Sequence, residues 1–245
     1  MLRVPMGTRQ FSQPTSWLAV GLFALLSGIA FVFALNGFLD ASSQALTAPP
    51  PEPLNINQAL IRPFVLQVGL AALLVLPLIT ARAYRQVPQG RSLRMALETF
   101  LGVLALYAVM LLAPLGLVAA LFLFGSPEWG PIASGGLGLM LTGAAFISAA
   151  LFVSSLATSA IAAGLATFAL SAMLAATAWL ARAGTPVAQG LFRQVSVGEG
   201  LDDFAKGVID TGHMVSCLIV IALGLFLTRH AIERRADSLR AATGN

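Results

Sequence analysis

The stretch from Phe100 to Phe124 reads FLGVLALYAVMLLAPLGLVAALFLF and contains no Asp, Glu, Lys or Arg. An α-helix of about 20 mostly apolar residues is long enough to cross the roughly 30 Å hydrocarbon core of a bilayer. The stretch therefore predicts a membrane-spanning helix. The rest of the chain has to show whether this helix is one of several.

The composition of the whole chain is that of a membrane protein. Its 245 residues are 58% hydrophobic and only 10% charged, and the mean hydropathy is +0.86. A globular domain carries roughly a quarter charged residues, so this chain could not cover its surface in water and lipid must be the solvent for much of it. A disordered chain is excluded, and so is a disulfide-stabilised secreted scaffold, because Cys217 is the only cysteine.

Six apolar stretches qualify as spans, which predicts an all-α, polytopic membrane protein with one six-helix transmembrane domain over residues 1–245. The predicted spans cover about 17–39, 64–79, 100–124, 135–156, 161–180 and 214–227. A tight helical hairpin at Ala157–Ala160 is expected to separate the fourth span from the fifth. No charged residue lies in any of the six. Because an intramembrane charge usually marks an ion or proton path, the pattern counts against a proton-coupled carrier.

The basic residues predict the orientation, because they concentrate in cytoplasmic loops. Ten arginines flank the spans on one side: Arg3, Arg9, Arg82, Arg85, Arg91, Arg94, Arg229, Arg234, Arg235 and Arg240. The other side has Arg62, Arg182, Arg193 and Lys206. We therefore expect both termini in the cytoplasm of a bacterium and the spans in its inner membrane.

The segment at about 186–210, before the last span, is predicted to form an amphipathic helix on the outer surface. Ser196 and Glu199 have the spacing of a capping box, and Leu201, Phe204 and Val208 recur at helical spacing. These three residues are candidates for docking a periplasmic subunit anchored in the membrane. A packed loop without a partner is the alternative that the residues leave open.

Small residues in the fourth and fifth spans predict close helix packing, since they let two backbones approach each other. Gly138, Gly143, Ser154 and Gly164 are the main candidates. The face that they form could pack against other helices of this chain or against a second copy.

Nothing in the sequence resembles a catalytic constellation. His213 and His230 lie near opposite ends of the last predicted span, so they are not expected to share a metal ion. Cys217 lies one helical turn beyond His213 and is expected to be a buried structural cysteine. We therefore predict no enzymatic activity, metal site or cofactor site in this chain, and no nucleic-acid partner.

An ordered set of short motifs resembles the membrane subunits of type-2 ABC exporters, in the branch with the gliding-motility permease and the permease of nitrous oxide reductase assembly. Leu201–Thr211 is similar to the outer helix of that branch, and Leu225–Thr228 with Ile232–Arg235 is similar to the exit of its last span. The further matches are Ser12–Pro14, Phe23, Ser27–Gly28, Leu76–Arg82, Gly138, Gly143–Phe146 and Ser154–Leu156.

The resemblance implies a permease subunit that pairs with a second copy or a paralogue and works with a separate ABC ATPase, which would bind ATP and Mg²⁺. In the family the ATPase docks on the loop between the second and third spans. The docking candidates in this chain are therefore Arg82, Arg85, Arg91 and Arg94.

That loop departs from the family pattern, because the paired acidic residues and the Glu-Leu-Leu run are absent and Pro88 would interrupt a helix. Two hypotheses follow: a working permease with a shortened docking loop, or a degenerate permease that serves as a structural subunit of a larger membrane complex. The four arginines could equally set the topology and contact anionic lipid. The substrate is not predicted.

Overall fold

A computed structural model describes residues 14–47, 54–83, 93–123, 125, 127–157, 159–183 and 197–243 of the chain. At 82–83, 93–95, 160, 177–183, 197–199 and 232–243 the backbone alone is described. Regular structure within these ranges is entirely helical. The helices are α2 (Pro14–Thr47), the π-helical turn η1 (Asn57–Ile61), α3 (Arg62–Ala83), α4 (Leu93–Leu121), α5 (Trp129–Leu156), α6 (Ala160–Ala183), α8 (Val197–Ala205) and α9 (Thr211–Thr243).

Five helical segments are long and apolar enough to cross a membrane. They are Pro14–Thr47, Asn57–Ala81, Ala96–Leu121, Trp129–Leu156 and Thr211–Ala231. The helix α6 corresponds to the fifth predicted span, and its side chains are described over the apolar segment Ile161–Ala176. The chain is therefore a polytopic helical protein with five candidate spans in its described part, and a sixth span through α6 stays a prediction.

The predicted hairpin between the fourth and fifth spans is confirmed, since α5 ends at Leu156 and α6 begins at Ala160. Ala157 has an extended backbone (φ −72°, ψ 147°), and its N–H donates to the carbonyl oxygen of Ser154. The chain therefore reverses within a few residues, as the short break in the apolar sequence predicts.

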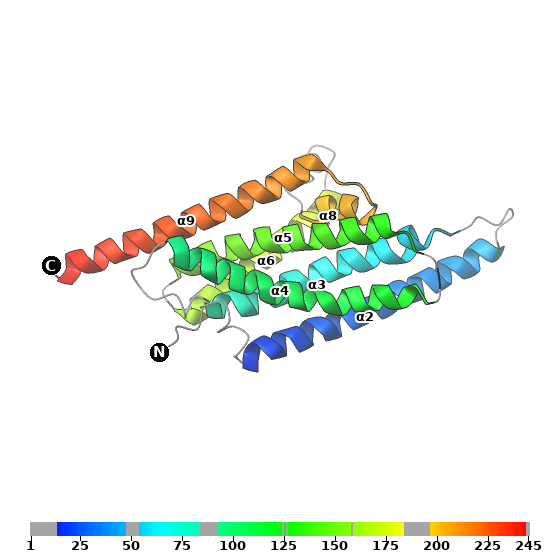
Figure 1. Cartoon of the computed structure of the whole chain (residues 1–245), viewed down its shortest axis with the longest axis horizontal. Helices are drawn as coiled ribbons and strands as arrows, with labels where there is room; N and C mark the ends of the chain where they lie inside the picture. The colour runs from blue at the N-terminus through cyan, green and yellow to red at the C-terminus, as the bar shows by residue number, and fades with distance from the viewer. Residues whose placement is uncertain are drawn as a thin grey trace.

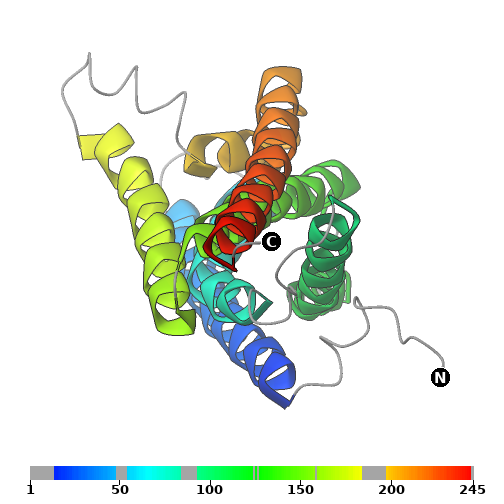
Figure 2. The same cartoon turned by 90° about the vertical axis from the view of Figure 1, so that its left-hand side faces the viewer.

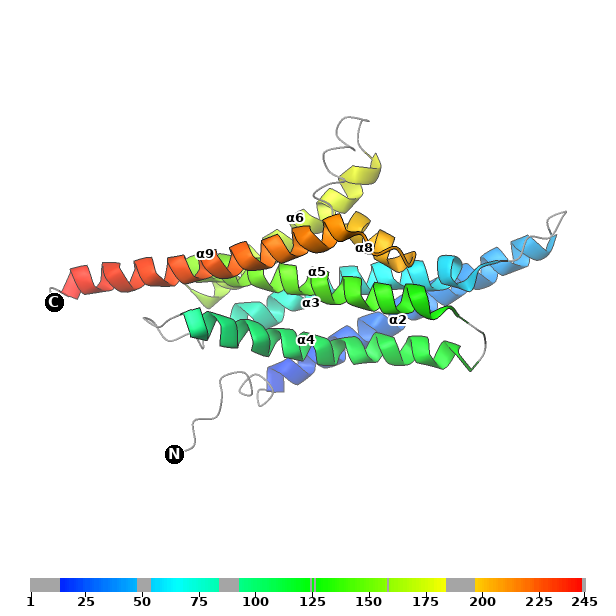
Figure 3. The ribbon, with the colours of Figure 1, turned by 45° about the horizontal axis from the view of Figure 1, so that its top comes forward.

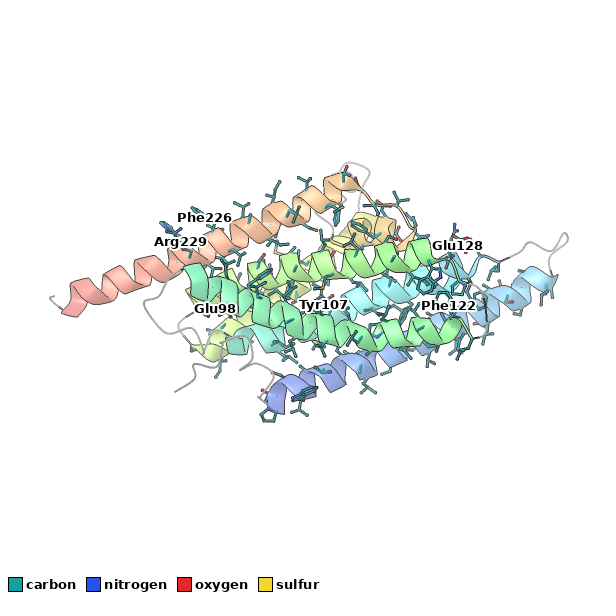
Figure 4. All side chains as sticks on the ribbon, in the orientation of Figure 1. Glu98, Tyr107, Phe122, Glu128, Phe226 and Arg229 are labelled. Atoms are coloured by element: carbon teal, nitrogen blue, oxygen red, sulfur yellow. The ribbon has the colours of Figure 1, made fainter. Side chains whose placement is uncertain are left out.

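The long helices alternate in direction along the molecule, and the short α8 lies beside α5 (Figure 1). The start of α2, the end of α3, the start of α4 and the end of α9 share one end of the bundle (Figure 1). Arg82, Arg94, Arg229 and the arginines after it all lie at this arginine-rich end. Figure 4 shows Glu98 and Arg229 towards it, with Phe122 and Glu128 at the opposite end.

The helix α5 is the centre of the bundle and contacts α3, α4, α6, α8 and α9. Seen along the long axis, α4 and α6 lie on opposite sides of it (Figure 2). The helix α6 crosses the bundle obliquely, so that its C-terminal end points away from the other long helices (Figure 3).

The core is aromatic in its middle and the outside is apolar as well. Tyr107, Phe23, Phe64 and Phe204 are among the largest fully buried side chains, whereas Leu123 is 81% exposed and many other large apolar side chains also face outwards. A soluble monomer rarely exposes such a continuous apolar surface, and lipid solvates it without cost. The fold is therefore that of a multi-pass membrane protein.

Candidate functional site

The short helix α8 is inserted into the bundle by its apolar face. Phe204 is fully buried and Leu201 is 3% exposed. A Cβ placed on Gly138 of α5 would lie 2.7 Å from the Cβ of Phe204, and one placed on Gly69 of α3 would lie 2.5 Å from Cδ2 of Leu201. These two glycines therefore form the surfaces against which α8 packs.

The burial of Leu201 and Phe204 agrees with the alternative that the sequence leaves open, a packed segment without a partner, and docking of a partner on Leu201, Phe204 and Val208 stays a prediction. Leu201 and Phe204 pack against other helices of this chain, because glycines of α3 and α5 leave room for their side chains. Only Val208, which is 56% exposed, could contact a partner in this conformation. The predicted capping residue Ser196 lies outside the described residues.

Hydrogen bonds hold the C-terminal end of α8 in place. The Ser134 hydroxyl of α5 donates to the carbonyl oxygen of Phe204 at 2.6 Å. Gly207 follows with φ of +91°, and the N–H of Val208 donates back to the carbonyl oxygen of Asp203 at 3.0 Å. A glycine in the left-handed region ends a helix at little steric cost, so α8 stops here and the chain turns towards α9.

An ion pair connects α8 to the start of α3, and a lysine that directly follows α8 contacts the same carboxylate. Arg62 donates to both carboxylate oxygens of Asp202, from Nε to Oδ1 at 2.5 Å and from the guanidinium NH2 to Oδ2 at 2.8 Å. Lys206 lies 2.6 Å from Oδ2 of Asp202 and 3.2 Å from Oδ1 of Asp203. The two-point contact between a guanidinium and a carboxylate fixes the relative orientation of the two helices.

The charged groups of this cluster stabilise one another's ionised forms. Burial by itself would raise the pKa of Asp202, but the hydrogen bonds from Arg62 and Lys206 outweigh that effect and lower the pKa. The hydrogen bond to Asp202 raises the pKa of Lys206. Both residues therefore stay charged around neutral pH, and the cluster lasts as long as α8 is packed.

The first turn of α9 continues this packed region. The His213 ring lies directly on Gly200 of α8 and meets the Phe204 ring edge to face, with the centroids 6.1 Å apart. Its Nε2 atom is buried and has no hydrogen-bond partner among the described residues. The helices α3, α5 and α6, together with His213 of α9, thus contact α8 directly before the last long helix.

The small residues of α5 and α6 pack within the chain. Tyr107 of α4 lies on Gly143, and its hydroxyl donates to the carbonyl oxygen of Leu139 at 3.0 Å. Figure 4 shows Tyr107 in the middle of the bundle. A Cβ placed on Gly164 would lie 3.6 Å from the Cβ of Ala81 in α3. Ser154 is 1% exposed, and its hydroxyl has no hydrogen-bond partner among the described residues. Gly138, Gly143 and Gly164 thus meet neighbouring helices of this chain.

The predicted ATPase-docking arginines fall largely outside the described structure. Arg85 and Arg91 lie outside the described residues, and Arg82 and Arg94 are described by their backbone alone. The backbone of Arg82 and of Arg94 lies at the arginine-rich end of the bundle (Figure 1).

The buried polar side chains of the described residues are Ser, Thr and Asn57, without a charged one among them. No group of three or more His, Cys, Asp or Glu that could hold a metal ion occurs in the same part of the chain. The helices themselves therefore provide packing surfaces, and the charges gather at the two ends of the bundle.

Two residues, Arg62 and Tyr107, have structural roles that the sequence does not indicate. Arg62 counts in the sequence only as one of four basic residues on the outer side, and Tyr107 only as part of an apolar stretch. An arginine at the start of an apolar span, with acidic residues in a later outer segment, is a signal that could have suggested the Arg62–Asp202 pair.

Comparison of the chain with family models, curated proteins and solved structures gave no match.

Proposed function

We propose that this chain is the permease subunit of an ABC transporter in a bacterial inner membrane, with six spans, both termini in the cytoplasm, and a separate ATPase chain as its partner. The observation that carries the proposal is the position of α8. This helix is packed against α3, α5 and α6, with His213 of α9 beside it. It lies immediately before the last span, where the resemblance to type-2 exporters implies an outer helix.

Two further features support this assignment. The arginine-rich end of the bundle lies opposite the end at which α5 begins (Figure 1), as expected for a cytoplasmic face that meets an ATPase. The alternating directions of the helices also agree with an even number of crossings, if α6 crosses as well.

Movement of the ATPases would be converted into movement of packed helices. In the proposed mechanism, closure of the ATPase pair on ATP and Mg²⁺ pulls on the connection between α3 and α4 and tilts one permease half against the other. The helix α3 carries both Gly69 and Arg62, which hold α8. A tilt of α3 is therefore transmitted to the outer end of the bundle, and this chain itself performs no covalent chemistry.

A second candidate function is a structural subunit that has lost its coupling to an ATPase. The observation that favours it is the short connection between α3, which ends at Ala83, and α4, which begins at Leu93. The family that the chain resembles has a longer loop there, and an ATPase needs a surface on which to dock.

Purification in mild detergent from the native membrane separates the two functions. For the permease, we expect a tagged chain to retain a subunit with a phosphate-binding loop and vanadate-sensitive ATP hydrolysis. The double variant Arg85→Glu/Arg91→Glu should lower ATPase retention at least fivefold, because it reverses the charges of the proposed docking loop. The matched control, Arg182→Glu/Arg193→Glu, reverses two arginines on the predicted outer side and should retain the ATPase.

A preparation that contains other membrane subunits but no ATPase would favour the structural role. Equal ATPase retention by both double variants would mean that Arg85 and Arg91 do not contact the ATPase. They would then serve to set the membrane topology.

A further inference from the structure

We propose that a cavity between α3, α4 and α5 binds one acyl chain of a bilayer phospholipid. The cavity has a volume of about 290 Å³. Its walls include Phe64 and Val68 from α3, Leu112 and Leu115 from α4, and Met140 from α5. Every residue that lines it is apolar, so it offers no hydrogen bond to a polar ligand.

The cavity has a deep side and an open side. Phe64 and Val68 form the deep side and are 1% and 0% exposed, whereas Leu112 and Leu115 are 61% and 53% exposed at the rim. A Cβ placed on Gly136, which also lines the cavity, would meet nothing within 4 Å. The opening is therefore lateral, on the face formed by α4 and α5.

The position of the opening indicates what enters it. The three helices around it belong to candidate membrane spans, so a lateral opening faces hydrocarbon. Leu115 lies about 9 Å along α4 from its end at Leu121, at 1.5 Å per residue. Beyond that end the rings of Phe122 and Trp129 stack with centroids 4.4 Å apart, as aromatic residues do at a membrane interface.

The size of the cavity fits an acyl segment. An apolar cavity of roughly 150 Å³ stays free of water and already holds a benzene-sized molecule, and empty space in a packed interior loses van der Waals contacts. A cavity of about twice that volume, open to lipid, gains those contacts back when a segment of acyl chain enters it. Bilayer phospholipids supply such chains at high local concentration, so we assign the site to them. This inference requires only that the helices are in a membrane, and it holds for either function proposed above.

Photo-crosslinking in vesicles tests the assignment. The chain is reconstituted in phosphatidylethanolamine and phosphatidylglycerol vesicles that contain a diacyl phosphatidylcholine with a diazirine at mid-chain, and the adducts are mapped by mass spectrometry. We expect adducts on Val65 and Leu139, which line the cavity and are each 6% exposed, so that a chain outside the cavity has little access to them. Gly136→Trp, which fills the cavity from α5, should lower these adducts at least fivefold.

Gly116→Trp is the matched control. Gly116 lies on α4, is exposed and also has open space around its Cβ position, but it does not line the cavity; the control should therefore keep the adducts. Ala108→Phe, which fills the cavity from α4, is a second variant in case Gly136→Trp does not fold. Labelling confined to exposed side chains such as Leu112, or equal adducts in all variants, would overturn the proposal. Labelling of Val65 by a diazirine fatty acid but not by the phospholipid would overturn the assignment to a diacyl lipid.

Discussion

At the scale of single residues, glycine decides where the large side chains of this bundle can go. Phe204 and Tyr107 are both fully buried, and each lies on a glycine of α5, Gly138 and Gly143 respectively. In a lipid environment the apolar surface between helices gives little driving force, so close packing has to supply the stability. Each ring seated on a glycine is therefore a specific contact that a larger residue would abolish.

The first prediction concerns Phe204. Phe204→Ala should lower the free energy of unfolding by about 3 kcal/mol, because it removes a fully buried ring and leaves a cavity against Gly138. Thermal unfolding of the purified chain in detergent measures the change. The matched control Val208→Ala removes an apolar side chain that is 56% exposed, and should change the stability by no more than about 0.5 kcal/mol. Equal effects of the two would mean that Phe204 is not packed in the bundle.

At the scale of elements, α8 is held by two different kinds of interaction. Its apolar side is packed on glycines of α3 and α5, and its polar side is tied to α3 through Arg62, Asp202 and Lys206. Exposed ion pairs contribute little, about 0.2–1 kcal/mol. The packed side therefore supplies most of the stability, while the two-point contact of Arg62 sets the orientation of α8.

The second prediction is a pH dependence of this anchor. Because the pKa of Asp202 is lowered in the folded chain, the docked state binds fewer protons than the unfolded one. The contribution is present in full above the ordinary Asp value of about 3.9 and is lost as the pH falls through the folded-state value. At pH 7 Asp202→Asn should cost about 1 kcal/mol, and the difference from the wild type should shrink as the pH falls below about 3.9.

Asp203→Asn is the control for this experiment. The Asp203 carboxylate lies 3.2 Å from Lys206 and its side chain is 47% exposed, so its loss should have a smaller effect at every pH. Unfolding midpoints of the three proteins, measured in detergent from pH 7 to pH 3, provide the comparison. A difference between wild type and Asp202→Asn that persists unchanged at pH 3 would contradict an electrostatic anchor.

At the scale of the whole molecule, the bundle separates its charges along the long axis. Arg82 of α3, Arg94 of α4 and the arginines of α9 lie at one end (Figure 1), whereas Arg62 at the start of α3 forms a cluster with Asp202 and Lys206 at the other end. Because basic residues concentrate on the cytoplasmic side, this arrangement predicts that the end of α9 is cytoplasmic.

The third prediction is this topology. In a Cys217→Ser background, a membrane-impermeant maleimide added to bacterial spheroplasts should label Glu128→Cys directly and Ala241→Cys only after permeabilisation. Both positions lie outside the five candidate spans, so neither substitution disturbs a membrane segment. Labelling of Ala241→Cys in intact spheroplasts would contradict the cytoplasmic assignment of both termini.

Sequence reasoning identified the class of the protein and most of its helices, because hydropathy is a local property that adds up along a stretch. The stretch from Phe100 to Phe124 is apolar whatever surrounds it, and α4 indeed runs from Leu93 to Leu121. The break at Ala157 is likewise visible as an interruption of one long apolar run. The amphipathic pattern of Leu201, Phe204 and Val208 also predicted a helix, but not what covers its apolar face.

Only the tertiary structure decided that last point, because an apolar face looks the same in sequence whether lipid, a partner or another helix covers it. Phe204 is buried since Gly138, far away in the sequence, leaves space for its ring. The Arg62–Asp202 pair joins residues 140 positions apart, and the cavity between α3, α4 and α5 exists only where three helices fail to fill the space between them. The apolar stretches by themselves determined a helical membrane protein; contacts between distant stretches decided where α8 binds and where a lipid chain can enter.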